Sequence, residues 1–126
     1  MNYDDYKHQD LTEKIISAFF KVYNTLGYGF LEKVYENAMV IELRKMGLIV
    51  EQQRRINVYY DGIIVGDYFA DLIVNELAIA ELKASKSLHS ENEYQLINYL
   101  KATEIEIGLL LNFGEKPEFK RKIYSN

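Results

Sequence analysis

The chain has 126 residues, a formal net charge of −4, no cysteine and two histidines. These values exclude a disulfide framework and a thiolate zinc site, and they argue against a histidine-rich metal site. The negative charge is a mild argument against tight nonspecific binding of nucleic acid, which depends on neutralising phosphates. With 48% hydrophobic residues and no run long enough to span a membrane, we expect one soluble, cytoplasmic domain over residues 1–126, with residues 1–9 flexible and no membrane partner.

Two amphipathic helices are predicted in the first third of the chain. The first begins with Asp10 as its N-cap and repeats apolar residues at helical spacing until Gly27. A turn over residues 27–29 follows. The second helix is predicted over residues 31–46, and Gly47 closes it.

The hydrophobic pattern then changes to the alternation that is typical of strands. The β-prone stretches are residues 48–53, 56–60, 63–66, 68–74 and 77–83. Asp61-Gly62 is a strong hairpin turn between two of them. The middle of the chain is therefore predicted to be a meander of strands.

The last third of the chain returns to mixed structure. A polar loop over residues 84–92 leads to a helix over 93–103, and a fully apolar strand over 107–111 is expected at a buried central position. A final strand over 119–124 carries three consecutive basic residues, which favours the edge of the sheet. The helix between strands 77–83 and 107–111 permits a right-handed parallel crossover.

Three ionisable residues interrupt the apolar strands. Glu81 and Lys83 are two residues apart, so the strand period of two puts them on one face, and Asp71 lies on the preceding strand. Ionisable groups at the end of a buried strand cost free energy unless they are paired or used. Two carboxylates suit Mg²⁺ or Mn²⁺, and an ammonium suits a phosphoryl group. The alternative is a cross-strand salt bridge on a solvated face.

The connection at Asn75-Glu76 decides whether the two carboxylates meet. A two-residue turn would set Asp71 opposite Ala80, with Asp71 and Glu81 on opposite faces. A three-residue loop or a bulge would set Asp71 opposite Glu81. Asn-Glu is a poor primed turn because its second position needs a positive φ. We therefore predict the longer loop or a bulge.

Two motifs resemble a known family. Asp71 followed by Glu81-Leu82-Lys83 resembles the acid and Glu-x-Lys pattern of the PD-(D/E)XK nuclease superfamily, and residues 29–35 read GxxExxY. Together the motifs resemble the GxxExxY protein family of that superfamily, from about residue 11 to 114. The resemblance implies an α/β (α+β) fold with a restriction-endonuclease-like core, in which helices flank a mixed central β-sheet.

The resemblance also implies roles for single residues. Asp71 and Glu81 would hold Mg²⁺ or Mn²⁺, Glu32 would complete the metal site, and Lys83 would help to activate water or stabilise the charged transition state. For Glu32 the alternative is a favourable interaction with the helix dipole. Tyr35 shares a helical face with Glu32 and fits packing or an orienting hydrogen bond better than catalysis.

Gln95 and Tyr99 are four residues apart and share one helical face. The pair resembles an extra motif of the RecB-like branch of the superfamily, in which either residue would orient a ligand or contact nucleic acid. A surface glutamine and a core tyrosine are the alternative. The family tends to have histidine at the positions of Tyr23 and Asn92, so any family-wide role of those histidines is in doubt here.

The basic and aromatic residues give weaker indications. The basic residues Arg44, Lys45, Arg54, Arg55 and Lys120 to Lys122 would guide a phosphate backbone if they flanked the acidic face. Exposed tyrosines such as Tyr28, Tyr59 or Tyr60 would stack on bases. A solvated surface and core packing are the respective alternatives.

The sequence thus predicts a Mg²⁺- or Mn²⁺-dependent nuclease that hydrolyses phosphodiester bonds in DNA or RNA. The alternative is a catalytically weak or inactive nuclease-fold module that acts by binding nucleic acid or protein. The small size and acidic charge favour this alternative, and the retained acids and Lys83 oppose it. A third interpretation is that the ion-rich face is a homo-oligomer interface.

Overall fold

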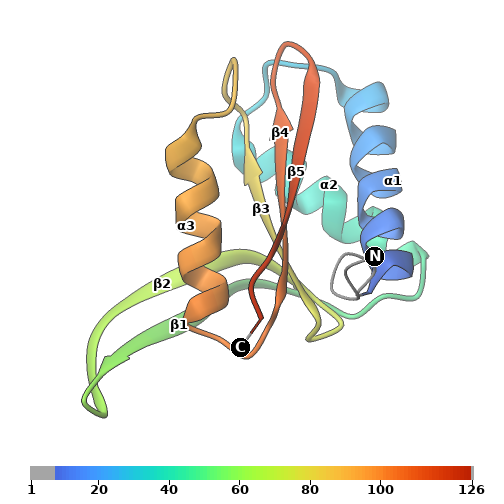
Figure 1. The fold of residues 1–126 in the computed structure, drawn as a ribbon. Coiled ribbons are helices and arrows are strands. Elements are labelled where there is room, and N and C mark those ends of the chain that lie inside the picture. Colours follow the sequence, from blue (N-terminus) through green and yellow to red (C-terminus); the bar gives the residue numbers. More distant parts are fainter. Residues whose placement is uncertain (1–7, 126) are drawn as a thin grey trace, which may run out of the picture.

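The computed structural model describes residues 8–125. Its helices are α1 (Gln9–Leu26), α2 (Glu32–Lys45) and α3 (Ser90–Lys101), and its strands are β1 (Val50–Tyr60), β2 (Ile63–Val74), β3 (Ala78–Lys83), β4 (Ile107–Phe113) and β5 (Pro117–Ile123). The strands form one sheet in chain order, in which β3 and β4 run parallel and the other neighbours run antiparallel (Figure 1). The predicted mixed sheet flanked by helices, an α+β fold, is confirmed, and so is the parallel crossover through α3.

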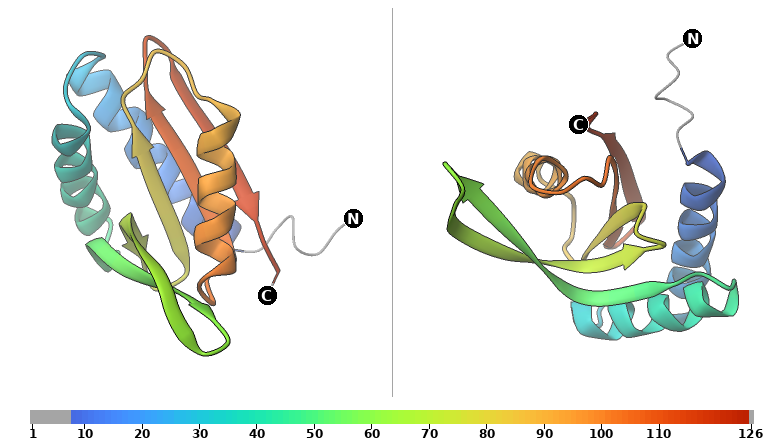
Figure 2. Two further views of the ribbon diagram at one scale, coloured as in Figure 1. Left: turned by 90° about the vertical axis from the view of Figure 1, so that its left-hand side faces the viewer. Right: turned by 90° about the horizontal axis from the view of Figure 1, so that it is seen from below.

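The helices cover both faces of the sheet (Figure 2). α1 and α2 pack on one face, where Phe19, Met39 and Leu82 belong to one buried cluster. α3 packs on the other face, where Leu96 lies directly against Gly108 of β4. A Cβ atom at Gly108 would lie 2.7 Å from Leu96 Cδ1, so glycine permits this close packing. Both layers cover β4, which is buried along its whole length as predicted, and β5 is at the edge as predicted.

The β1–β2 hairpin extends beyond the rest of the sheet, and we call its outer part, residues 56–69, the arm (Figure 1). Its turn is at Asp61-Gly62 as predicted, with φ of 51° and 75°. β1 is a single strand, so the prediction of two separate stretches at 48–53 and 56–60 was wrong. The strand continues through Gln53, whose φ of 52° is unusual, because pairing with β2 holds on both sides of that residue.

Two predicted helix starts were wrong. The N-cap of α1 is His8 rather than Asp10, which lies in the first helical turn. α3 begins at Ser90, earlier than the predicted residue 93, because Asn92 Oδ1 accepts a hydrogen bond from the His89 N–H (3.2 Å) and caps the helix. The segment predicted to be flexible lies largely outside the described residues.

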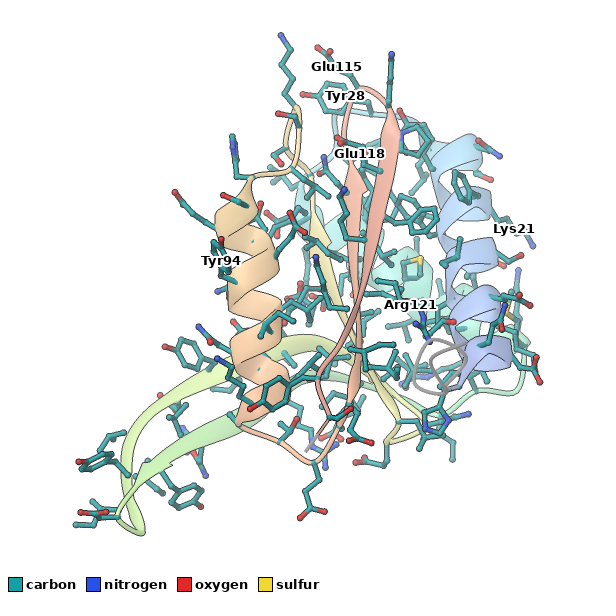
Figure 3. The ribbon with its side chains drawn as sticks, viewed as in Figure 1. Lys21, Tyr28, Tyr94, Glu115, Glu118 and Arg121 are labelled. Carbon is teal, nitrogen blue, oxygen red and sulfur yellow. The ribbon has the colours of Figure 1, made fainter. Side chains whose placement is uncertain are left out.

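The turn between α1 and α2 is held by two buried or half-buried tyrosines. Tyr35 Oη donates a hydrogen bond to Gly27 O (2.6 Å) and accepts one from the Phe30 N–H (3.1 Å), and its ring stacks on that of Phe113 at 4.2 Å. Tyr23 Oη lies 2.8 Å from Gly114 O in the β4–β5 turn. The two turns therefore meet at one end of the molecule, where Tyr28 and Glu115 lie in Figure 3.

None of the helices in the described part of the chain is both long enough and apolar enough to cross a membrane.

Candidate functional site

The β2–β3 connection sets the relation between the two carboxylates. Val74 pairs with Ala78 and Leu72 with Ala80, so the connection is a three-residue loop, as predicted. If the register is continued by one residue beyond Leu72 and Ala80, Asp71 lies opposite Glu81. The reason for the prediction was wrong, however, because Asn75 and Glu76 both adopt positive φ, 53° and 56°. Asn75 tolerates this conformation well, and its side-chain oxygen accepts a hydrogen bond from the Ile49 N–H (2.8 Å).

Asp71 lies where β2 and β3 separate. The regular pairing ends at Leu72 and Ala80, and the Asp71 carboxylate then bridges the two strands, because Oδ2 accepts a hydrogen bond from the Leu82 N–H (2.9 Å). Its other oxygen, Oδ1, accepts one from Gln53 Nε2 on β1 (3.1 Å). These bonds fix the carboxylate between three strands, which is the rigid support that a metal ligand requires.

Glu81 is a buried carboxyl group with an unused oxygen. Its side chain is 5% exposed, and Oε1 has no hydrogen-bond partner among the described residues. Burial, with the neighbouring Asp71 carboxylate adding to it, raises the pKa of Glu81 to about 10, although the Lys83 ammonium opposes this. A buried polar atom without a partner is uncommon, and an oxygen of this kind suits a metal ligand.

This burial predicts how the metal-free protein responds to pH. The pKa of Glu81 is about 10 when folded and near 4.5 when unfolded, so between these pH values only the folded state holds the proton. The stability that this proton contributes to the folded state is complete below pH 4.5. It is lost as the pH rises toward 10, by up to about 1.4 kcal/mol per pH unit. Glu81→Gln removes this dependence. As the pH rises, the free energy of unfolding of wild type should therefore fall, while that of Glu81→Gln should not fall for this reason.

Urea unfolding in EDTA across this pH range measures the difference between Glu81→Gln and wild type. Glu104→Gln, at an exposed position between α3 and β4, is the control and should follow wild type. Parallel pH curves for wild type and Glu81→Gln would contradict the prediction.

Lys83 of β3 and Glu32 of α2 complete the cluster of charged residues around Asp71 and Glu81. The cluster thus combines residues from β2, β3 and α2. Glu32 is the first residue of α2 and is exposed. Partial loss of hydration raises its pKa, the Lys83 ammonium lowers it, and the charges of Asp71 and Glu36 raise it again. In the part of the chain that the structure describes, no ion pair or hydrogen bond engages the half-buried Lys83 ammonium. The cross-strand salt bridge that was the alternative for this face is thus not present among these residues.

Glu36 and Gln53 belong to the same region, and the sequence analysis missed both. Glu36 is 4% exposed; its Oε1 accepts a hydrogen bond from Gln53 Nε2, and its Oε2 accepts one from Lys33 Nζ, both at 2.7 Å. Because Gln53 also bonds Asp71, a chain of contacts runs from α2 to the strand carboxylate. The signal was available, since Glu36 lies four residues after Glu32 and therefore on the same helical face.

The end of β3 is held by a third residue that the sequence did not predict, Asn112. It is fully buried on β4 opposite Lys83, its Oδ1 accepts a hydrogen bond from the Ser85 N–H (3.0 Å), and its Nδ2 donates one to Ser85 O (2.9 Å). The two bonds fix the chain directly after Lys83. A polar residue at the end of an otherwise apolar strand was the sequence signal for this role.

Gln95 and Tyr99 of α3 lie on the same side of the sheet as the two carboxylates. Tyr99 is 5% exposed, and burial, with the charges of Glu81 and Asp71 adding to it, raises its pKa to about 12. Gln95 is half-buried and lines a surface cavity of about 430 Å³ together with Tyr99 and Tyr68. Tyr35, by contrast, is enclosed in the core and supports the turn before Glu32, the position of a packing and orienting residue.

Several basic residues that were expected to guide a phosphate backbone are engaged elsewhere. Arg54 pairs with Glu76 (2.6 Å), and Arg55 pairs with Asp67 (3.1 Å). On β5, Lys122 pairs with Glu93 (2.6 Å). Pairing with acids reduces the charge that these residues offer to a phosphate, and their guiding of a phosphate backbone stays a prediction. The tyrosines Tyr28, Tyr59 and Tyr60 are exposed, at 49%, 60% and 71%.

The chain matches the model of a known protein superfamily. The model of the PD-(D/E)XK nuclease superfamily matches residues 9–122, which include the cluster of acids and Lys83. The chain belongs to the PD-(D/E)XK nuclease superfamily. Searches of curated proteins and of solved structures gave no match. Membership of this nuclease superfamily indicates a nuclease function and a nucleic-acid substrate, and its nucleases generally use divalent metal ions.

The carboxylates of this PD-(D/E)XK protein fit a divalent ion in their chemistry. Asp71 and Glu81 offer hard oxygen donors, and Glu81 Oε1 is buried without a partner in the described chain. No group of three or more acidic, histidine or cysteine side chains within residues 8–125 is already arranged around one point. The structure therefore presents two adjacent strand carboxylates, with Glu32 nearby on α2 as the candidate third ligand.

Proposed function

We propose that the protein is a metal-dependent nuclease that hydrolyses phosphodiester bonds through Asp71, Glu81 and Lys83. The observation that carries the proposal is the buried Glu81 carboxyl group, which lies beside Asp71 and has an oxygen without a hydrogen-bond partner among the described residues. Lys83, on the same strand, makes no ion pair or hydrogen bond within residues 8–125. A stable fold gains nothing from this arrangement alone, because burial of an unsatisfied carboxyl group costs free energy.

Each residue of the site has a proposed role. Asp71 and Glu81 hold Mg²⁺ or Mn²⁺, with Glu32 as the third ligand. The bound ion would supply Lewis-acid activation of the phosphodiester and of water. Lys83 stabilises the negative charge that develops on the phosphoryl oxygens. Gln53 and Glu36 hold the Asp71 carboxylate in place through their hydrogen bonds. Gln95 and Tyr99 contact or orient the substrate.

The experiment that tests the proposal compares single-stranded and double-stranded DNA and RNA as substrates, with Mg²⁺, Mn²⁺ or EDTA. Cleavage that needs either metal ion supports the nuclease. Calorimetric titration of the protein with Mn²⁺ tests the ion site separately from turnover. Failure of the protein both to bind Mn²⁺ and to cleave any substrate would overturn the proposal.

One observation favours a second candidate, a catalytically weak or inactive nuclease-fold module that acts by binding nucleic acid or protein. In residues 8–125, no three ligands are arranged for an ion. A site in which Glu32 never reaches the strand carboxylates would bind metal poorly. Nucleic-acid binding without cleavage in the same assays would support this candidate.

We further propose that the chain belongs to the GxxExxY family within the superfamily and that residues 1–126 form one cytoplasmic nuclease-like domain. The contacts of the motif support the assignment to the family. Gly29 has a φ of 120°, which favours glycine, and Tyr35 bonds the turn that leads to Glu32. Each named residue of the motif thus contributes to the position of the proposed third ligand.

A homo-oligomer is also part of the proposal, and the end of the arm supports it. Tyr60, Ile63 and Val65 are 71%, 67% and 62% exposed, a dense apolar surface for a monomer. Light scattering coupled to size exclusion should detect a dimer that Ile63→Lys weakens. Ile49→Lys, at a similarly exposed site outside the arm, is the control. A monomer at all concentrations would exclude the oligomer.

A further inference from the structure

We propose that the groove between α3 and the arm binds a single nucleic-acid strand, whose bases stack on Tyr68 and Tyr94 on their way to the strand carboxylates. This inference rests on the proposed nuclease function and adds a substrate class to it, unpaired rather than duplex nucleic acid.

The groove consists of two adjoining cavities beside α3. One, of about 430 Å³, is lined by Tyr94, Gln95 and Tyr99, and the other, of about 440 Å³, by Asn57, Tyr59 and Lys101. Tyr68 and Asn98 line both cavities, so the two form one continuous surface. Figure 2 shows α3 alongside the arm, and Figure 3 shows Tyr94 projecting outward from α3. The lining residues run along α3 from Glu91 to Ala102, about 16 Å of helix, which is more than the length of one nucleotide.

Tyr99 connects this groove to the proposed active site. Its ring lies 5.3 Å from that of Tyr68, between centroids, so it forms part of the groove wall. Tyr99 also belongs to the same buried cluster as Ile79, which is two residues before Glu81 and therefore on the same face of β3. The charges of Glu81 and Asp71 contribute to the raised pKa of its phenol. A strand bound along α3 would therefore pass within reach of the carboxylates.

The chemistry of the groove suits bases better than phosphates. Tyr68 and Tyr94 are 46% and 69% exposed, and the side-chain amides of Asn57, Gln95 and Asn98 can both donate to and accept from base edges. Among the described residues that line the groove, Lys101 is the one cation, and Glu91 carries the opposite charge.

This composition separates single strands from duplexes. Duplex binding depends mainly on neutralising phosphates with Lys and Arg, of which the described lining residues of the groove include Lys101 alone. In a duplex the base faces are already stacked on one another, so exposed tyrosines gain nothing from them. In a single strand every base offers a free face, and stacking on aromatic side chains is tolerant of sequence. The tyrosines and amides of the groove therefore favour an unpaired strand.

The test measures binding by fluorescence anisotropy in EDTA, with labelled oligo(dT) and oligo(U) of about 12 nucleotides and a duplex of equal length. We expect a single strand to bind tighter than the duplex, with a weak dependence on salt. Tyr68→Ala and Tyr94→Ala should each weaken this binding about 5- to 150-fold, and Tyr94→Phe should retain it. Phe69→Ala, at a neighbouring position of the arm that is 48% exposed and lines neither cavity, should bind as wild type.

Three results would overturn the inference: equal or tighter binding of the duplex, no binding of any oligonucleotide, and binding that Tyr68→Ala and Tyr94→Ala leave unchanged. The same experiments test the groove and the nuclease function independently of each other. Cleavage with binding that is insensitive to the tyrosines would keep the nuclease and remove the groove. Tyrosine-dependent binding without metal-dependent cleavage would keep the groove and support the binding module.

Discussion

Asp71→Asn is expected to lower metal-dependent cleavage by at least about 10³-fold, with the fold unchanged. Asparagine keeps an oxygen that accepts the hydrogen bond from the Leu82 N–H, so the bridge between β2 and β3 remains. It removes the negative charge, and with it most of the several kcal/mol of transition-state stabilisation that a bound ion supplies. Lys83→Met should cost about 10²- to 10³-fold, as does the loss of one group that stabilises the charge of a transition state.

Initial rates on the best substrate, with purified variants at equal concentration, measure both effects. Asp67→Asn, on the same strand and in an exposed ion pair with Arg55, is the control for Asp71. Lys86→Met, whose side chain is 79% exposed, is the control for Lys83. Both controls should cleave as wild type does. Cleavage that survives in Asp71→Asn and Lys83→Met would show that the activity belongs to a contaminant or to another site.

Asn112→Leu is expected to cause the largest loss of stability among single substitutions near the site. Leucine has a similar size but makes neither of the two hydrogen bonds to Ser85, so the N–H and the C=O of this half-buried residue lose these partners. Each unsatisfied group costs about 1–3 kcal/mol, and together they would consume a large part of the stability of a domain of this size. Because Lys83 is two residues before Ser85, the residual folded protein should also cleave more slowly.

Urea unfolding monitored by circular dichroism measures this loss. The matched control is Asn24→Leu, at an exposed position of α1, which should change the free energy of unfolding by less than about 0.5 kcal/mol. Equal midpoints for Asn112→Leu and wild type would show that Ser85 finds other partners and that Asn112 does not hold the end of β3.

The sequence was sufficient for the features that depend on period and residue type. The strand period placed Glu81 and Lys83 on one face, and the resemblance supplied the superfamily that the family model later matched. The apolar run at residues 107–111 indicated a buried strand, since a strand covered on both faces cannot alternate. Local patterns of this kind predict structure well because they record which side chains the core buries.

The sequence was not sufficient for the features that depend on neighbours far apart along the chain. Glu36 was recognisable as a neighbour of Glu32 on one helical face, but its hydrogen bond to Gln53 of β1 joins residues that are 17 positions apart along the chain. Asn112 likewise gains its role from Ser85, 27 residues earlier. The pairing of Arg54 with Glu76, 22 residues later, could not be predicted from the sequence either. Hairpin turns can also tolerate strain, as the positive φ of Glu76 shows.

The bond from the Asp71 carboxylate to the Leu82 amide has an evolutionary consequence. A descendant released from selection for cleavage would still need an oxygen acceptor at position 71, because an apolar replacement would leave the buried amide unsatisfied at a cost of about 1–3 kcal/mol. Drift should therefore replace Asp71 with asparagine before alanine. Lys83, which no partner in the described chain restrains, is free to vary. Among descendants, a retained lysine at position 83 is thus better evidence of activity than a retained aspartate at position 71.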